Sequence, residues 1–248
     1  MKTVLITGCS SGYGLETARY FHERGWRVVA GMRTPRPEVL PASERLQVVG
    51  LDVTKPASIA QAVAEAGPID VLVNNAGIGL FGAVEVTPMS TIREIFETNT
   101  LGTIAMVQAV VPQLRARGAG VIINVTSSAV LTPMPMVAVY TASKTAVEGF
   151  TGSLAFELGA FNIKVKLVEP GYGPSTRFTR NGADRMDGLI PQAYAPLADG
   201  LIAALGNPRA VTRPIDVAEV VWAAAHDDSV RLRFPAGPDA VALAGAGA

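Results

Sequence analysis

Seven short runs of Val, Ile and Leu recur along the chain, and stretches with helical periodicity separate most of them. Most runs are apolar at every position rather than at every second one, which is typical of parallel strands covered on both faces. The pattern predicts an α/β fold, a doubly wound parallel sheet of about seven strands with helices on both faces. The expected strands are Val4–Ile6, Arg27–Ala30, Leu46–Val49, Ile69–Val73, Gly120–Val125, Ile163–Val168 and, more weakly, Arg231–Phe234. The expected helices are Leu15–Arg24, Ser58–Ala66, Ser90–Arg117, Ala138–Ala160 and Pro214–Ala225.

Composition excludes several classes of protein. Of the 248 residues, 49% are hydrophobic, and 21 basic residues balance 21 acidic ones. This composition excludes disorder and argues against a nucleic-acid or anionic-membrane surface. No apolar stretch approaches the roughly 20 residues of a membrane span, and the apolar segment at the start is too short for a signal peptide. Cys9 is the single cysteine and there are two histidines, so we expect no disulfide framework, no metal site and a cytoplasmic location.

No linker, repeat or low-complexity segment divides the chain, so we expect one domain over residues 1–248. The stretch 170–213 departs from the regular pattern, because it is rich in Gly, Pro and Arg and lacks clear periodicity. A segment this long inside a compact domain is usually a functional lid or a binding loop. We therefore expect a substrate lid at residues 170–213.

A glycine-rich turn follows the first expected strand and leads directly into the first expected helix. Glycine lacks the Cβ that would prevent a backbone from turning sharply and approaching a pyrophosphate. The N-terminus of the following helix would offer free N–H groups and a partial positive charge to the phosphates. A glycine cluster alone also fits an ordinary tight turn, but its place between the first strand and helix of an α/β pattern favours a dinucleotide site. The turn contains Gly8, Ser10, Ser11, Gly12, Tyr13 and Gly14.

The spacing of these glycines, G-x-x-x-G-x-G, resembles the turn of the short-chain dehydrogenase/reductase family. Six further segments match this family in sequence order, over nearly the whole length of the chain. They are Asp52-Val53, Asn74-Asn75-Ala76-Gly77, Asn99, Ser127, the Y-x-x-x-K motif from Tyr140 to Lys144, and the Pro170-Gly171 turn. Ser127 rather than Ser128 matches the family's catalytic serine, which stands thirteen residues before the tyrosine.

The resemblance implies a Rossmann-type fold, a nicotinamide dinucleotide cofactor, and a catalytic set of Asn99, Ser127, Tyr140 and Lys144. We expect cofactor contacts at Gly8, Ser10, Ser11, Gly12, Tyr13, Gly14, Arg33, Asp52, Val53, Asn74, Ala76, Gly77, Tyr140, Lys144, Pro170, Gly171, Gly173 and Ser175. Three positions depart from the family's pattern. Tyr13 replaces a small aliphatic residue, Gly173 replaces a branched aliphatic residue behind the nicotinamide amide, and Ser175 replaces a threonine that often binds that amide.

Tyr140 and Lys144 are four residues apart on an expected helix, so both project from one face. A free phenol has a pKa of about 10 and is a poor acid–base catalyst at neutral pH. We expect the Lys144 ammonium to stabilise the phenolate and to lower the pKa of Tyr140 into a useful range. Ser127 would hydrogen-bond the substrate oxygen, which gains negative charge as hydride arrives. For Asn99, a role in holding a water that relays protons to the lysine is implied by the resemblance alone.

The end of the second strand predicts the choice of cofactor. An NAD enzyme places an acidic residue there to bind both hydroxyls of the adenine ribose, and that carboxylate repels a 2′-phosphate. In this chain Met32 takes that place, Arg33 follows it, and no carboxylate occurs before Glu38. Arg33 can form charge-assisted hydrogen bonds with the phosphate, and Ser11 or Arg36 can add to them. The alternative interpretation is an ordinary solvated arginine after a strand.

These features predict an NADP(H)-dependent oxidoreductase that interconverts a ketone or aldehyde and an alcohol, similar to single-domain carbonyl reductases and steroid dehydrogenases of the family. One alternative is an NAD-dependent alcohol dehydrogenase of the same fold, and another is a redox-silent regulator that binds dinucleotide. A hydrolase using Ser127 with Lys144 ranks last, because it has no need of the dinucleotide turn. The mostly apolar segment Ala129–Val137 favours a hydrophobic substrate with broad tolerance.

The resemblance also implies a homodimer or homotetramer whose interface uses the two long helices, Ser90–Arg117 and Ala138–Ala160. Their apolar residues are more than one internal face would need, which favours a symmetric homo-oligomer. This set is Ile104, Val107, Val110, Val111, Leu154 and Leu158.

Overall fold

The computed structural model describes residues 1–176, 182–208 and 210–246. Within these residues a seven-stranded parallel sheet has the strand order β3-β2-β1-β4-β5-β6-β7. This order and the parallel pairing confirm the doubly wound α/β fold. The strands are β1 (Thr3–Thr7), β2 (Arg27–Met32), β3 (Leu46–Gly50), β4 (Val71–Asn74), β5 (Gly120–Val125), β6 (Ile163–Pro170) and β7 (Arg233–Ala236).

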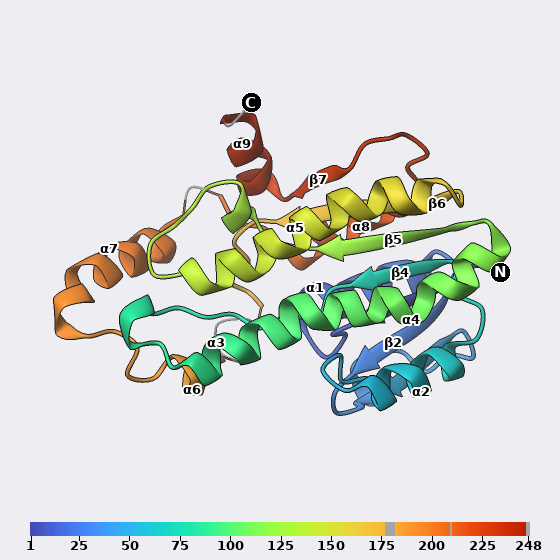
Figure 1. Ribbon diagram of the computed structural model, residues 1–248, viewed down its shortest axis with the longest axis horizontal. Helices are drawn as coiled ribbons and strands as arrows, with labels where there is room; N and C mark the ends of the chain where they lie inside the picture. The colour runs from blue at the N-terminus through green and yellow to red at the C-terminus, as the bar shows by residue number, and fades with distance from the viewer. Residues whose placement is uncertain (177–181, 209, 247–248) are drawn as a thin grey trace.

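Helices cover both faces of the sheet (Figure 1). One face carries α1 (Gly12–Glu23) and α8 (Pro214–His226), and the other carries α2 (Pro56–Ala66), α4 (Gly102–Arg117) and α5 (Ala138–Gly159). Three helices lie beyond the carboxyl ends of the strands, on the side to which the β5 arrowhead points: α3 (Met89–Phe96), α6 (Ala183–Met186) and α7 (Ala195–Gly206). The last helix, α9 (Pro238–Ala246), follows β7.

The central strands supply side chains to two cores at once. In β1, Val4 and Ile6 belong to the core under α1 and α8, whereas Leu5 belongs to the core under α2, α4 and α5. All three side chains are fully buried. Because successive strand residues face opposite sides, a strand covered on both faces must be apolar at every position. The continuous apolar runs in the sequence therefore have a direct structural cause.

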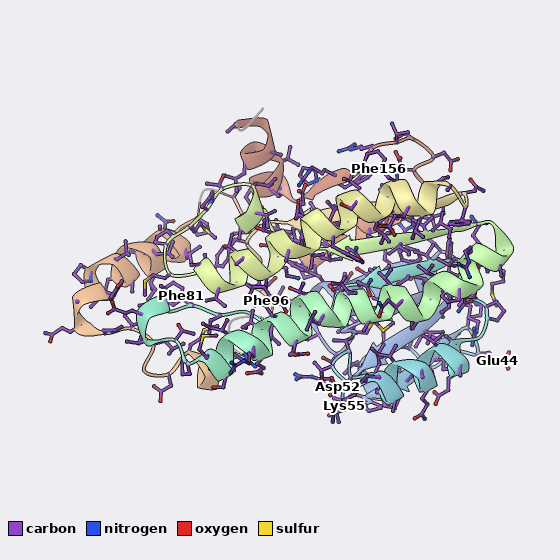
Figure 2. All side chains as sticks on the ribbon, in the orientation of Figure 1. Glu44, Asp52, Lys55, Phe81, Phe96 and Phe156 are labelled. Atoms are coloured by element: carbon purple, nitrogen blue, oxygen red, sulfur yellow. The ribbon has the colours of Figure 1, made fainter. Side chains whose placement is uncertain are left out.

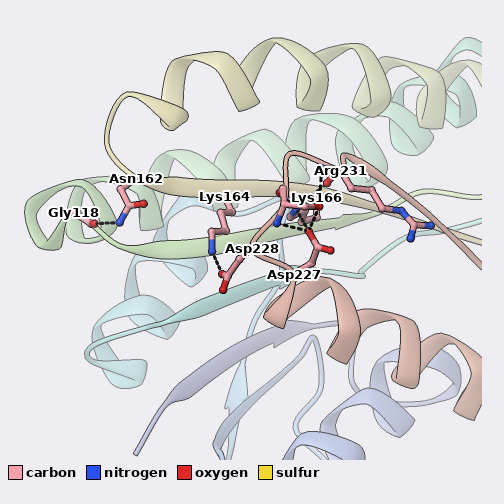
Figure 3. Close-up of polar contacts among 8 residues, drawn as sticks. Gly118, Asn162, Lys164, Lys166, Asp227, Asp228 and Arg231 are labelled. Atoms are coloured by element: carbon pink, nitrogen blue, oxygen red, sulfur yellow. Dashed lines mark hydrogen bonds and ion pairs between the residues drawn. The ribbon is translucent and has the colours of Figure 1, made fainter.

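Charged groups tie β6 to the connection between α8 and β7 (Figure 3). The Lys166 side chain is 2% exposed, and its ammonium donates to Asp227 Oδ1 at 2.7 Å and to two backbone carbonyls. Nearby, Lys164 pairs with Asp228. A buried ammonium is tolerated when protein acceptors replace its water. These contacts hold the connection that leads into β7.

The structure differs from the sequence-based expectation in three segments of the chain. The stretch Ser90–Arg117 contains a π-helical turn, Glu97–Leu101, between α3 and α4. Within 170–213 the structure has α6 and α7, and α7 is apolar at most positions, so it has no polar and apolar faces to detect. The Ala- and Gly-rich α9 was also not expected.

The apolar residues assigned to an oligomer interface lie mostly in the chain's own core. Val107, Val110, Leu154 and Leu158 are at most 7% exposed and pack in the core under α4 and α5. The inference from an excess of apolar residues is therefore wrong, because the internal face of these helices uses them. On α5, Phe156 does face outward and is 87% exposed (Figure 2).

Across the described residues, no helix combines the length and the apolar character needed to cross a membrane.

Candidate active site

The glycine-rich turn lies at the carboxyl edge of the sheet, beside the point where the strand order reverses between β1 and β4. Gly8 and Gly12 have φ angles of 75° and 59°, in the left-handed region that favours glycine. A Cβ at Gly14 would lie 2.4 Å from both the carbonyl oxygen of Gly8 and Nδ2 of Asn75. All three glycines are therefore required for the local conformation or packing.

The N-terminus of α1 is open to an anionic ligand. Ser11 is its N-cap residue but makes no side-chain capping bond, and the first turn carries no acidic residue. The free N–H groups and the positive end of the helix dipole are therefore not neutralised. A helix N-terminus of this kind beside a glycine turn suits a pyrophosphate.

Asn75 braces this turn, a role that the sequence did not reveal. Its Nδ2 donates to the carbonyl oxygens of Thr7 and Gly8 at 3.0 and 3.3 Å, and the Thr7 hydroxyl accepts the backbone N–H of Asn75 and of Ala76. Asn74, expected to contact cofactor, directs its side chain into the sheet and donates to Asn124 Oδ1 at 2.9 Å. Successive side chains along an extended chain point to opposite sides. Asn74 therefore hydrogen-bonds within the sheet, and Asn75 hydrogen-bonds the glycine turn.

The end of β2 lies beside the same turn. The strand ends at Met32, which is buried, and Arg33 is exposed. Arg36 donates to the carbonyl oxygen of Ser10 in the glycine turn. At the end of β3, the Asp52 carboxylate accepts the backbone N–H and the hydroxyl of Thr54, and the labelled pair of Asp52 and Lys55 lies beside α2 (Figure 2). Two guanidinium groups therefore follow β2 with no carboxylate between them.

Three expected catalytic side chains meet at the end of β5. Tyr140 and Lys144 lie one turn apart on α5 and are 9% and 4% exposed. Ser127 follows β5 and hydrogen-bonds the Tyr140 hydroxyl. Lys144 Nζ donates to the carbonyl oxygen of Val125 at 3.0 Å. The lysine thus fastens α5 to the strand end that carries Ser127.

Burial changes the acidity of both groups on α5. Burial raises the pKa of Tyr140 to about 12. The hydrogen bond with Ser127 favours the phenolate and so has the opposite, smaller effect on this pKa. Burial lowers the pKa of Lys144 to about 8, and the charge of Glu148 opposes that shift. The expectation of a lowered Tyr140 pKa is therefore wrong for the chain by itself, because the effect of burial outweighs that of the hydrogen bond with Ser127. Tyr140 holds its proton in this state.

A buried acidic pair, Glu148 and Glu169, lies behind Lys144, and neither residue is among the site residues predicted from sequence. Thr126 donates its hydroxyl to Glu148 Oε1 at 2.7 Å, and Arg233 of β7 pairs with both Glu148 and Glu169. Burial, and then the charge of Glu148, raise the pKa of Glu169. The available signal was the four-residue spacing of Lys144 and Glu148 on one helix.

Asn99 lies in the π-helical turn and is fully buried. Its Oδ1 accepts the backbone N–H of Ile78 at 2.8 Å, while Nδ2 donates to the Ile78 carbonyl and to Ser143 Oγ. A Cβ at Gly77 would lie 3.2 Å from Lys144 Nζ and 3.3 Å from Asn99 Oδ1. Asn99 therefore faces Lys144 across Gly77, and π-turns often occur at functional sites of this kind.

The turn after β6 is held by α9. Asp239 accepts the backbone N–H of Tyr172 at 2.6 Å and the hydroxyl of Thr212 at 2.5 Å. A Cβ at Gly171 would lie 2.2 Å from the Asp239 carboxylate, so this position of the Pro170-Gly171 turn requires glycine. Gly173 and Ser175 follow within the described residues, whereas residues 177–181 and 209 of the expected lid lie outside them.

Apolar side chains form two packing clusters, one of which contains Tyr140. Ala129 and Leu189 pack with Tyr140 in one cluster, and Met136 packs with Ala83 and Ala198 in a second. Phe81 and Phe96, labelled in Figure 2, pack against these clusters. Leu189 belongs to the stretch 170–213, so this stretch packs against the cluster that contains Tyr140.

One ion pair fastens the same stretch to α3. Arg185 of α6 donates to both carboxylate oxygens of Glu94, at 2.7 and 3.1 Å. A bidentate pair fixes orientation as well as distance.

Cys9 does not provide an alternative nucleophile at the site. Cys9 is fully buried and burial raises its pKa, so its thiol is not a nucleophile. In the part of the chain that the structure describes, no group of His, Cys, Asp and Glu is assembled to hold a metal ion.

Comparison with known proteins agrees with this geometry. The family model described as short chain dehydrogenase matches residues 2–186. The chain is similar to retinol dehydrogenase 8 from Bos taurus, with 42% identity over 184 residues that cover 68% of this chain and 58% of that protein. The chain therefore spans less than two thirds of the length of this relative.

Solved structures resemble the chain over nearly its whole length. A short-chain dehydrogenase from Streptomyces avermitilis matches with a TM-score of 0.84 and 30% identity, covering 99% of this chain and 91% of that one. One from Burkholderia cenocepacia in complex with NADP has a TM-score of 0.78 and 27% identity, covering 99% and 93%. The 3-ketoacyl-(acyl-carrier-protein) reductase from Brucella melitensis, complexed with NADH, has a TM-score of 0.77 and 26% identity, covering 95% and 96%.

Proposed function

The chain belongs to the short-chain dehydrogenase family, and we propose that it is an NADP(H)-dependent oxidoreductase interconverting a ketone or aldehyde and an alcohol. The observation that carries this proposal is the hydrogen bond between Ser127 and Tyr140, one helical turn from Lys144, at the same edge of the sheet as the glycine turn. In this proposal residues 1–248 form one dinucleotide-binding and catalytic domain.

The residues present fit a nicotinamide dinucleotide. The glycine turn packs closely on Asn75 and Ala76, with no room for a Cβ at Gly8 or Gly14, and the N-terminus of α1 that follows it is not neutralised. The turn and α1 would hold the pyrophosphate, Asp52 and Val53 would hold the adenine, and the turn at Gly171 would receive the nicotinamide. The bound cofactor would supply or accept the hydride.

Tyr140 would give a proton to the substrate oxygen in reduction and take it back in oxidation. Its pKa of about 12 keeps it protonated before reaction. Lys144, with a pKa of about 8, is mostly charged at neutral pH and would stabilise the phenolate that remains after proton transfer. Ser127 would hold the substrate oxygen toward the phenol.

The end of β2 supports NADP(H) over NAD(H). Arg33 is exposed directly after the strand, Arg36 contacts the turn through Ser10, and no acidic residue stands at the strand end. The NADP complex of the Burkholderia cenocepacia protein is consistent with this choice. An NAD-dependent enzyme is the second candidate, favoured by the NADH complex of the Brucella melitensis protein.

The apolar residues Ala129 and Leu189, which pack with Tyr140, support a hydrophobic carbonyl or alcohol substrate. The name of the Bos taurus relative, a retinol dehydrogenase, points to the same class of substrate. We propose that residues 170–213 act as a substrate lid, because Leu189 and Arg185 pack this stretch against the site and against α3.

The test is a cofactor-oxidation screen with NADPH and NADH against apolar and polar ketones and aldehydes. We expect NADPH oxidation to be fastest with an apolar carbonyl compound. Tight NADPH binding without turnover of any compound would favour the regulator instead. Ester hydrolysis without cofactor, abolished by Ser127→Ala, would favour the hydrolase.

A further inference from the structure

Tyr13 connects the two turns that border the proposed cofactor site. Its hydroxyl donates to the carbonyl oxygen of Gly171 at 3.2 Å, across 158 residues of sequence. Tyr13 lies in the first turn of α1, and Gly171 directly follows β6. These two elements come from opposite sides of the point where the strand order reverses.

The same phenol fills the space in which a side chain at position 173 would begin. A Cβ at Gly173 would lie 2.1 Å from the Tyr13 hydroxyl oxygen and 2.9 Å from its Cζ, closer than real Cβ atoms approach. Residue 173 must therefore be glycine while Tyr13 keeps this position. Tyr13 and Gly173 both depart from the family's pattern, and the two changes compensate each other. The side chain is larger at position 13 and absent at position 173, so the phenol occupies the space that a side chain at 173 would need.

The Tyr13 hydroxyl is a permanent donor. Burial raises the pKa of Tyr13 above its usual range, and the nearby charge of Asp239 adds to the shift. Asp239 holds the other side of the same turn through the N–H of Tyr172 and the hydroxyl of Thr212. The turn at Gly171 is therefore held from two sides, by Tyr13 and by Asp239.

We propose that Tyr13 is a positioning residue that, through Gly171, sets the spacing between the glycine turn and the turn after β6, and with it the seat of the nicotinamide half of the cofactor. This inference rests on the proposed function. A misplacement of about 1 Å between reacting atoms can cost about 10²-fold in rate. The spacing of these two turns therefore bears on turnover although Tyr13 touches no reacting atom in this scheme.

The first experiment separates the two halves of the cofactor. Tyr13→Phe keeps the ring and removes the donor, and we expect it to raise the dissociation constant of NADPH by about fivefold, the size of one lost hydrogen bond. The fragment 2′-phospho-ADP-ribose lacks the nicotinamide, so we expect it to bind this variant as tightly as it binds the wild type. Equal losses for both ligands, or no loss for NADPH, would overturn the inference.

The second experiment is a double-mutant cycle on Tyr13 and Gly173. Gly173→Val alone sets a new side chain against the phenol, and we expect NADPH affinity to fall by at least about tenfold. Tyr13→Ile frees that space, so the double variant should recover to within about threefold of the wild type. Gly159→Val, at an exposed glycine with open space around it, is the control and should bind NADPH normally. Additive losses in the double variant would contradict the pairing.

The melting temperature of each variant without ligand distinguishes a variant that fails to fold from one that folds with the two turns displaced. If Gly173→Val alone does not fold, recovery of folding and binding in the double variant supports the pairing, and failure of both variants contradicts it. Wild-type protein that binds neither NADPH nor NADH would refute the proposed function. Wild-type protein that binds NADPH, with Tyr13→Phe binding it equally well, would refute this inference alone.

Discussion

Thr126 donates its hydroxyl to Glu148 at 2.7 Å, and this bond joins the end of β5 to α5. The carbonyl oxygen of the preceding residue, Val125, accepts a hydrogen bond from the Lys144 ammonium. Glu148 lies one helical turn beyond Lys144, and its charge raises the Lys144 pKa against the effect of burial. The acid behind the lysine therefore helps to keep the ammonium charged.

Glu148→Gln should move the alkaline limb of the pH profile to lower pH. The amide can still accept from Thr126, and Arg233 keeps its partner Glu169, but the charge that opposes Lys144 desolvation is lost. Lys144 titrates near pH 8 in the wild type, so removing the negative charge lowers this pKa further and the ammonium is lost at lower pH. We expect a shift of about one unit in kcat/KM profiles with the best ketone. Glu157→Gln, on an exposed part of α5, is the control, and an unchanged or higher midpoint for Glu148→Gln would contradict the prediction.

Tyr140→Phe should abolish turnover and leave NADPH binding nearly intact. The proton donor is lost, but the ring still fills its buried position beside Ser127. General acid–base catalysis contributes about 10²–10⁴ in rate, so kcat should fall by at least this factor. Steady-state kinetics measure the loss of turnover, and NADPH titration measures the retained binding. Tyr20→Phe on α1 is the control. Wild-type activity in Tyr140→Phe would refute the mechanism.

Arg33→Ala should remove most of the preference for NADPH. We expect wild-type kcat/KM for NADPH to exceed that for NADH by at least tenfold, which needs about 1.4 kcal/mol. The loss should appear as a raised KM for NADPH with NADH little changed, because Arg33 would contact only the 2′-phosphate. Arg115→Ala, on the last turn of α4, is the control for a general loss of positive charge. Equal or better use of NADH by the wild type would overturn the cofactor assignment while leaving the oxidoreductase assignment intact.

Arg185→Ala should raise the KM for the carbonyl substrate several-fold without changing NADPH affinity. The substitution releases the bidentate pair with Glu94 that fastens α6 to α3. The Glu94 side chain is half exposed, and ion pairs open to solvent contribute about 1 kcal/mol or less. Lys164→Ala breaks an exposed pair with Asp228, which lies outside residues 170–213, and so serves as the control. A larger effect on NADPH affinity than on substrate KM would contradict a lid at residues 170–213.

Phe156→Glu should shift the protein toward the monomer. We propose that α4 and α5 form the interface of a homodimer or homotetramer, and Phe156 is a large apolar side chain on α5 that is 87% exposed. A charge at the centre of an apolar interface is left without a partner, which destabilises association. Light scattering at micromolar concentration measures the mass. Wild-type protein that is a 25.8 kDa monomer would refute the oligomer.

The features that could be predicted from sequence are those that short segments determine. Parallel strands such as β1 and β5 are mostly apolar because both faces are covered. This pattern can be recognised from the sequence of each strand alone, without knowing which strands pair with it. The glycine turn is legible for a similar reason, because positive φ at Gly8 and Gly12 is a local requirement. The proximity of Tyr140 and Lys144 follows from helical spacing alone.

Only the tertiary structure decided how these groups behave together. The pKa of Tyr140 rises to about 12 because neighbouring elements bury the phenol, and burial is a property of the assembled fold rather than of helical spacing. The contact of Tyr13 with Gly171 joins positions 158 residues apart, so no local pattern contains it. The four-residue spacing of Glu148 and Lys144 is visible in the sequence, but the bond to Thr126 depends on where α5 packs against β5. The sequence by itself determined which groups are present and in which elements, and the packing of those elements determined their solvation and their partners.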